Sequence, residues 1–368
     1  PIGAVFVPVY PTTTEEEVDL LLRHSESRFV FAGDLMQFQK AFAILNRVKS
    51  PLKKLMVNYH VDTGNPGVIS YDELIRLGRR SGRIVQAAQM LRDVALDDLA
   101  ALIYTPGTTG IPKGALLTHG NFLAQRRLLE LFNVTDKDVR LAHLPFSHVF
   151  GLSADLFSAI GTGSLLCIMR SFETEEVLEY IREVRPTIIC SVPRMYEKIC
   201  VNIVQGLQHC GRLRRSLASL AIRVGRSHYF ARISKRRVPL LLSLAKRALY
   251  PQLRRIRSSL GMGRMRFLVS GGGPLPLEVA YFFGGIGLPI TEGYGLTETS
   301  PIINVNRPDL NKPGTVGPPL EGVTEKISDE GEILVKGPTV FKGYYKNEEE
   351  DAVAFTNDGF FRTGDIGI

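Results

Sequence analysis

Short apolar runs alternate with amphipathic segments along most of the chain. Residues 2–9 and 29–32 have the continuous apolar character of buried strands, and residues 14–25 between them have the pattern of a helix. Thr14 precedes that helix with Glu17 three residues later, which is the pattern of a capping box. Buried strands that alternate with helices predict an α/β fold whose sheet is covered on both faces. Further strands are predicted at 99–105, 164–169 and 187–193, a strand followed by a glycine turn at 266–273, and helices from residue 118, at 174–184 and over 201–260.

The texture of the chain changes near residue 310. From there, short apolar segments are separated by Gly and Pro, as in GTVGPPLEGV and GEILVKGP. This pattern is typical of a small β-subdomain. We therefore expect two α/β sheet subdomains at about 1–130 and 131–305, followed by a small β-barrel-like subdomain at 306–368.

Composition excludes several classes of protein. Of the 368 residues, 44% are hydrophobic and 22% are charged, which is the profile of a globular protein and not of a disordered, collagen-like or disulfide-rich chain. The four cysteines form neither a CxxC pair nor a zinc framework, so we expect reduced thiols and a cytoplasmic location. No apolar stretch reaches the length of about 18 residues that a transmembrane helix needs.

The formal net charge of +8 is distributed unevenly. Residues 198–277 contain 17 Lys and Arg and no Asp or Glu, whereas the rest of the chain contains 28 basic and 37 acidic residues. One cationic insert at 200–262 therefore lies in an otherwise acidic protein. Its mixture of Leu, Ile and Ala with Arg is typical of a helix on an anionic membrane surface. A solvated helical face packed on the domain is the alternative. Nucleic-acid binding is disfavoured, because the insert has few aromatic residues and no recognised motif.

The strongest chemical signal is the segment YTPGTTGIPKGALLTHGN at residues 104–121. Its loop from Thr105 to Gly114 follows a predicted buried strand and contains three Gly, three Thr and one Lys. Backbone N–H groups, hydroxyls and an ammonium on one loop can surround a polyphosphate. The spacing is not that of a Walker motif. A flexible turn without a ligand is the alternative.

Two further segments accompany this loop, EGYGLTETSP at 292–301 and GFFRTGD at 359–365. The three motifs, in this order, resemble those of the adenylate-forming (AMP-binding) superfamily, which includes acyl-CoA synthetases, luciferases and the adenylation domains of peptide synthetases. The resemblance covers essentially the whole chain and implies the large N-terminal domain of that fold. The superfamily's C-terminal lid domain is expected to follow Gly367. We therefore expect residues 1–368 alone to bind ATP weakly and not to complete thioester formation.

The resemblance implies a role for each matching residue around the phosphates. Thr297 is expected to donate to the α-phosphate and Glu298 to bind Mg²⁺, so that these two residues and Lys113 are the implied catalytic residues. Pro106 stands where the family often has Ser or Thr, which removes one hydroxyl and one N–H from the loop. The residues implied to hold the β- and γ-phosphates of ATP are Thr105, Gly107, Thr108, Thr109, Gly110 and Lys113.

The resemblance also implies a nucleoside site. Tyr294 is expected to lie against the adenine, and Asp365 to accept hydrogen bonds from the ribose hydroxyls. Glycines are expected to let the backbone approach the nucleotide closely. Solvated strand ends and tight turns are the alternatives for these segments. The glycines concerned are Gly271, Gly272, Gly273, Gly293 and Gly295.

A third site is implied by LPFSHVFGLSADLF at residues 144–157. In acyl- and aryl-CoA synthetases this segment lines the carboxylate substrate site, so Phe146 and His148 are expected near the acyl group. A packed core histidine is the alternative reading of His148. Ser147 stands where a peptide-synthetase domain would carry Asp to pair with an α-amino group, and an amino-acid substrate is therefore disfavoured.

The length of the basic insert indicates which members of the superfamily the chain resembles. Roughly 65 residues of Arg-rich helix separate VPRMYEKI from RFLVSGGGPLP, and this resembles the long-chain fatty acyl-CoA synthetases. The implied reaction uses ATP, Mg²⁺ and coenzyme A to convert a long-chain fatty acid, through an acyl-adenylate, to acyl-CoA, with release of AMP and pyrophosphate. Alternatives are a fatty acyl-AMP ligase, an acyl-carrier-protein synthetase and a truncated nucleotide- or acyl-binding scaffold. We expect peripheral contact with the inner face of the membrane. Acyl chain length and oligomeric state, a homodimer included, stay open.

Overall fold

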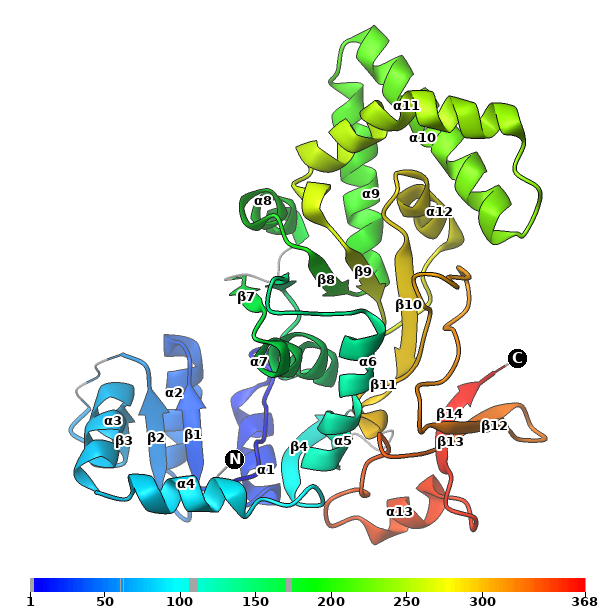
Figure 1. The fold of residues 1–368 in the computed structure, drawn as a ribbon. Helices are drawn as coiled ribbons and strands as arrows, with labels where there is room; N and C mark the ends of the chain where they lie inside the picture. The colour runs from blue at the N-terminus through cyan, green and yellow to red at the C-terminus, as the bar shows by residue number, and fades with distance from the viewer. Residues whose placement is uncertain (1–2, 60, 62, 106–111, 170–173, 368) are drawn as a thin grey trace. The chain divides into compact units, whose positions relative to one another are not determined.

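The computed structural model describes residues 3–59, 61, 63–105, 112–169 and 174–367. The chain divides into two compact units, Pro1–His119 and Gly120–Ile368, and each is described by itself (Figure 1). The subdomain boundaries expected near residues 130 and 305 stay predictions.

The first unit contains a three-stranded parallel sheet and a hairpin. The sheet has the order β1 (Phe29–Ala32), β2 (Lys54–Val57), β3 (Val68–Ser70), and the antiparallel hairpin joins β4 (Leu99–Thr105) to β5 (Lys113–Thr118). The sequence predicted β1 and β4 with these bounds. The helices are α1 (Glu15–His24), α2 (Leu35–Leu45), α3 (Tyr71–Arg80) and α4 (Ile84–Arg92).

The helix α1 begins as its sequence predicts. The Glu17 N–H donates to Thr14 Oγ1 at 3.3 Å, and the Thr14 N–H donates to Glu17 Oε2 at 2.9 Å. These two bonds satisfy backbone donors that the first turn of a helix leaves unpaired. The predicted capping box is therefore confirmed.

The prediction of a buried strand at residues 2–9 is wrong for the part that the structure describes. Phe6 makes only an isolated bridge to Ala101, through hydrogen bonds of 3.0 and 2.9 Å with the neighbouring residues of β4. Pro8 has no N–H to extend a ladder. The side chain of Phe6 is 50% exposed, so the apolar run does not mark a core strand.

The second unit is built on a six-stranded sheet. Its strand order is β11 (Ile302–Val305), β10 (Ile290–Gly295), β9 (Phe267–Ser270), β8 (Ile188–Ser191), β6 (Val139–Ala142), β7 (Leu165–Ile168). All neighbours pair in parallel except β10 and β11. The helical segments that follow the first unit include α5 (His119–Ala124), α6 (Arg126–Leu131), the π-helix η1 (Gly151–Phe157), α7 (Ser158–Thr162), α8 (Thr174–Val184), α9 (Pro193–Gln208) and α12 (Leu277–Gly285).

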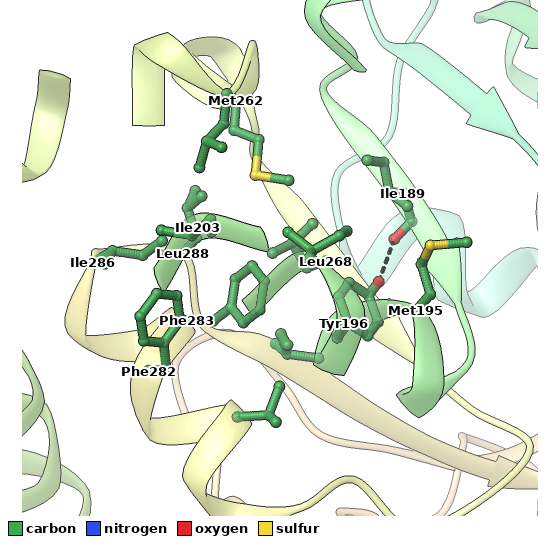
Figure 2. Close-up of a cluster of buried hydrophobic side chains, with 14 of the residues drawn as sticks. Ile189, Met195, Tyr196, Ile203, Met262, Leu268, Phe282, Phe283, Ile286 and Leu288 are labelled. Atoms are coloured by element: carbon green, nitrogen blue, oxygen red, sulfur yellow. Dashed lines mark hydrogen bonds between the residues drawn. The ribbon is translucent and has the colours of Figure 1, made fainter. Parts of the chain in front are cut away.

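Both faces of this sheet are buried. Ile189 and Leu268 belong to one apolar cluster, whereas their neighbours Cys190 and Val269 belong to another on the opposite face. This is the period of two that a strand imposes. In the first cluster, the Tyr196 hydroxyl donates to the carbonyls of Ile189 at 3.2 Å and Val269 at 2.9 Å (Figure 2). The α/β expectation is confirmed.

The basic insert forms two long helices, α10 (Arg212–Ile233) and α11 (Leu240–Ser259), which contact each other (Figure 1). The backbone of α10 packs closely on α12, because a Cβ on Gly225 would lie 2.2 Å from the carbonyl oxygen of Gly285. One face of α10 is therefore packed on the domain, while its arginines Arg214, Arg215 and Arg223 are exposed. No helix of the described residues has the length and apolarity to cross a membrane.

The last part of the second unit is an antiparallel three-stranded sheet, β12 (Thr324–Ile327), β13 (Glu332–Lys336) and β14 (Phe361–Ile366), with α13 (Glu348–Ala354). The predicted β-subdomain is present, but its described strands do not close into a barrel. β12 and β14 each pair with β13 and not with each other, so the sheet is open.

Candidate active site

The ends of the predicted phosphate loop are fixed by the hairpin of the first unit. Thr105 ends β4, Lys113 begins β5, and the two residues are register partners. The Thr105 hydroxyl donates to the Lys113 carbonyl at 3.4 Å. The two described ends of this segment therefore lie on adjacent strands, and its role in phosphate binding stays a prediction. Pro106, Gly107, Thr108, Thr109 and Gly110 lie outside the described residues.

Glu298 lies in the short 3₁₀ helix η3 (Thr297–Thr299) of the second unit and is buried. Its Oε1 accepts a hydrogen bond from the Tyr344 hydroxyl at 2.9 Å. The Phe341 N–H also donates to the Glu298 carbonyl at 2.8 Å. Burial, followed by the charge of Glu298, raises the pKa of Tyr344, so the phenol stays a hydrogen-bond donor at neutral pH.

The surroundings of Glu298 suit one kind of metal binding. Among the described residues, no group of three or more His, Cys, Asp or Glu side chains is arranged to hold an ion. A single carboxylate suits Mg²⁺, because this ion keeps several waters and is commonly held by one or two carboxylates and the phosphates of a substrate. The residues present therefore fit an ion that arrives with a nucleotide and do not form a protein-only metal cage.

The turn that carries Thr297 and Glu298 is fixed by buried polar groups that the sequence analysis missed. Thr299 Oγ1 accepts from the Leu296 N–H at 2.8 Å and donates to the Pro301 carbonyl at 2.5 Å. Gln125 donates to the Ile302 carbonyl at 3.0 Å. Ser and Thr side chains that bind nearby backbone are a recognisable turn signal, but the contact with Gln125 spans 177 residues.

The glycines of the motifs are held for different reasons. A Cβ on Gly295 would lie 1.7 Å from the Pro301 carbonyl oxygen, and a Cβ on Gly293 would lie 3.3 Å from that of Asn304. Gly272 has a φ of +78°, which other L residues rarely adopt. Gly271 is buried against Phe150, whereas Gly273 is exposed and open. Tight packing and turn geometry thus account for most of them, and their contact with a nucleotide stays a prediction.

Two residues of the predicted nucleoside site meet in the second unit. The Tyr294 hydroxyl on β10 donates to Asp365 Oδ2 on β14 at 2.7 Å, across 71 residues of sequence. Burial is the main cause that raises the pKa of Tyr294. Asp365 itself is exposed, so its carboxylate is accessible to a second donor such as a ribose hydroxyl.

The predicted acyl-site residues Phe146 and His148 lie on the loop between β6 and η1. His148 Nδ1 accepts from the Phe150 N–H at 3.0 Å, so the neutral ring carries its proton on Nε2. His148 is accessible to solvent, although the surrounding protein lowers its pKa by desolvation. It is therefore not the packed core histidine of the alternative reading.

A second histidine, His143, is the buried one. Its Nε2 lies 3.0 Å from Ser191 Oγ, while the Ser191 carbonyl accepts from the Gly271 N–H at 3.1 Å. Burial lowers the pKa of His143 to about 4, so its ring is neutral at physiological pH. These contacts connect the start of the LPFSH segment to the glycine turn. The sequence signal was a histidine directly before Leu-Pro.

Arg140 of β6 and Asp155 of η1 form a buried pair that the sequence did not single out. Arg140 Nη1 lies 3.9 Å from Asp155 Oδ1, and it donates to the Ala154 carbonyl at 2.7 Å. Burial raises the pKa of Asp155 to about 7, an effect that Arg140 reduces. The pair lies within the core, where one partner without the other would leave an uncompensated charge.

Comparison with known proteins identifies the family. A family model described as an AMP-binding enzyme matches residues 1–345. The chain is 34% identical over 373 residues to long-chain-fatty-acid–CoA ligase FadD15 of Mycobacterium bovis, with 100% of this chain and 59% of that protein covered. It is 30% identical over 417 residues to the chloroplastic long-chain-fatty-acid–[acyl-carrier-protein] ligase AEE15 of Arabidopsis thaliana, with 99% and 56% covered.

A solved structure agrees with these relatives. ATP-bound MatB from Rhodopseudomonas palustris matches with a TM-score of 0.67 and 26% identity, covering 99% of this chain and 61% of that one. The chain thus spans about three fifths of the proteins it matches. The expectations of the adenylate-forming family and of its α/β fold are both confirmed, and the chain belongs to the AMP-binding enzyme family.

Proposed function

We propose that the protein activates a long-chain fatty acid with ATP and transfers the acyl group to coenzyme A. The observation that carries this proposal is the geometry of one stretch of the second unit. Strand β10 leads directly into η3, so Tyr294 and Glu298 lie four residues apart on a turn held by buried hydrogen bonds, and Asp365 returns to Tyr294 at 2.7 Å. Nucleoside recognition and a metal-binding carboxylate would then occupy one short segment.

In the first step, a carboxylate oxygen of the fatty acid attacks the α-phosphorus of ATP, and pyrophosphate leaves. Both reactants are anions, so the protein must hold them together and neutralise charge that develops at the α-phosphate. Lys113 and Thr105 would hold the departing phosphates, and Thr297 would donate to the α-phosphate. Glu298 would hold Mg²⁺, which supplies charge neutralisation when bound.

In the second step, the thiol sulfur of coenzyme A attacks the acyl carbon and loses its proton to water, the C–O bond to the phosphate breaks, and AMP leaves. Phe146 and His148 would lie beside the acyl group. The Nε2–H of the neutral His148 ring would be available there as a hydrogen-bond donor. The fatty acid as substrate is supported by the relative from Mycobacterium bovis, whose name states that activity.

Peripheral contact with an anionic membrane is part of the proposal. Exposed apolar and basic side chains share the insert helices. Leu213 is 84% exposed between Arg212 and Arg214, and Leu241 of α11 is 80% exposed. Such a surface is attracted to anionic lipid, where a long-chain fatty acid also partitions. A purely solvated helical face is the alternative.

A carrier-protein acceptor is the second candidate, because one relative is named as an acyl-carrier-protein ligase. Full-length protein should release pyrophosphate with ATP and long-chain fatty acids across a chain-length series. Thioester should then form with coenzyme A and not with carrier protein. Pyrophosphate release without transfer to either thiol would indicate an acyl-AMP ligase. No pyrophosphate release with any acid would favour the binding scaffold.

A further inference from the structure

A groove of about 650 Å³ opens on the second unit between α9, α10 and α12. None of the residues that line it belongs to the three motifs assigned to ATP or to the acyl segment. Three helices supply its walls, with Arg215, Arg223 and Arg226 all on α10. Offsets of 8 and 11 residues place these arginines on one side of a helix. The groove therefore presents a row of cations.

The charge in the groove is only partly compensated. Glu278 is its one acidic residue, and it forms an ion pair with Arg226. Arg215 and Arg223 make no ion pair within the part of the chain that the structure describes, and both are exposed. Because no Asp or Glu occurs at 198–277, no acidic residue of the insert can neutralise them. A ligand for this groove is therefore anionic.

The remaining wall is apolar. Ile222 and Phe282 are buried, and the rings of Phe230 and Tyr281 meet edge to face at 5.4 Å. Phe230 nevertheless keeps 40% of its surface exposed. Inorganic phosphate or a nucleotide would leave this apolar wall exposed to water, whereas an acyl chain would cover it. The ligand is therefore an anionic amphiphile.

The groove is a fixed feature of the fold. Gly225 of α10 lies against Gly285 of α12, and a Cβ on Gly284 would lie 2.2 Å from the Tyr229 ring. Backbones this close leave the two helices little freedom to move apart without losing contact. The arginines and the aromatic pair consequently face the same space in a defined arrangement.

We propose that this groove binds one anionic membrane phospholipid. Its phosphate contacts Arg215, Arg223 and Arg226, and the first carbons of one acyl chain lie along Ile222, Phe230 and Tyr281. The phospholipid is favoured as the occupant because charge and apolar surface are adjacent, as they are in its headgroup and chains. The inference deepens the proposed membrane contact and rests on it, but it is independent of the acyl-transfer reaction.

Residues 1–368 contain no Trp, so in this chain a Phe230→Trp variant reports on the groove without background from another Trp. Titration of this variant with dihexanoyl phosphatidylglycerol below its micelle concentration should give a saturable fluorescence change. Dihexanoyl phosphatidylcholine and inorganic phosphate should give none. Tyr281→Trp is a second reporter in case the first variant does not fold. An equal response to phosphatidylcholine, or a response to phosphate alone, would overturn the lipid assignment.

A charge-matched pair of variants separates the groove from general attraction. In the reporter background, Arg215→Gln with Arg223→Gln should raise the Kd for phosphatidylglycerol at least fivefold. Arg254→Gln with Arg255→Gln removes the same charge from α11, outside the groove, and should change it less than twofold. Glu278→Gln should lower the Kd, because it releases Arg226. Equal losses in both pairs would refute the groove and leave membrane attraction intact, and pyrophosphate release by the same variants reports separately on the proposed reaction.

Discussion

Two regions of the second unit are proposed to contact anions, and they differ in the burial of their polar side chains. The turn at 292–301 buries its polar groups, with Thr299 and Ser300 0% exposed, and fixes them by short hydrogen bonds. The helices α10 and α11 leave most of their arginines in solvent. In the proposed function the turn would stabilise charge at one defined point, whereas the helices supply a summed field that salt screens. Substitutions in the turn should therefore act through geometry, and those in the helices through ionic strength.

The largest effect is expected from a matched pair of glycines. A Cβ would overlap backbone at Gly295 in the turn and at Gly225 in the insert, so each Gly→Ala change should lower the free energy of unfolding by about 3 kcal/mol. Only Gly295→Ala should also abolish pyrophosphate release by the folded protein. Denaturant unfolding and a pyrophosphate assay measure the two effects. Gly206→Ala, at an open and exposed position on α9 outside the proposed site, is the control, and full activity of Gly295→Ala would contradict the comparison.

The second-largest effect is expected when one charge is removed and the shape of the side chain is kept. Glu298→Gln should lower the rate of pyrophosphate release about 100-fold, or about 2.7 kcal/mol, because charge at the reacting phosphate loses its metal-binding partner. The dependence of this rate on Mg²⁺ concentration should also shift in the Glu298→Gln variant. Tyr344→Phe removes the hydrogen bond to Glu298 and should reduce the rate about fivefold. Arg254→Gln removes a charge from α11 and should leave the rate unchanged. Equal rates for Glu298→Gln and the wild type would exclude the metal role.

A pH dependence should follow from His143 beneath the glycine turn. Its folded pKa of about 4 lies below the ordinary 6.5, so below pH 6.5 the unfolded chain binds a proton that the folded chain refuses. Stability should fall by about 2 kcal/mol as the pH falls from 6.5 toward 4. Urea unfolding at pH 7 and pH 4.5 measures it. His143→Gln should remove this part of the dependence, and His209→Gln on the exposed end of α9 should not. If the unfolding free energy of His143→Gln changed with pH as it does in the wild type, another group would be the cause of the pH dependence.

The smallest effect is expected in the insert. Arg254→Gln should weaken binding to vesicles that contain phosphatidylglycerol about fivefold at low salt, or ~1 kcal/mol for one basic residue near the surface. At 0.5 M salt the difference should vanish, because the screening length becomes shorter than the distance to the lipid charges. Vesicle co-sedimentation measures both. A difference that persists at high salt would indicate a specific contact of Arg254.

The sequence predicted elements well where the signal is local. The strand at 99–105 and the helix at 174–184 have the predicted bounds, and the Thr14 capping box is present. Apolar runs, side-chain caps and Gly or Pro breaks act within a few residues. The same rule failed at residues 3–9, because an apolar run shows neither its pairing partner nor its exposure.

The site was predictable only as a set of motifs. No local pattern shows that Tyr344 binds Glu298 across 46 residues, or that Tyr294 meets Asp365. His143 stood one residue before a segment that was singled out, yet only its partner Ser191 in a neighbouring strand distinguishes it from His148. Contacts between distant strands depend on how the sheet is ordered, and that order is a property of the whole domain.

The glycines at which α10 packs closely on α12 have a consequence for the sequences of related chains. Strands β8 and β9 pair in parallel, and the chain between them contains α9 and the hairpin of α10 and α11. A single helix is enough for a connection of this kind. Gly284 and Gly285 of α12 leave room for Tyr229 and Arg226 of α10. A related chain without the hairpin would have no steric need for glycine there, and larger side chains at those two positions would be the record of its absence.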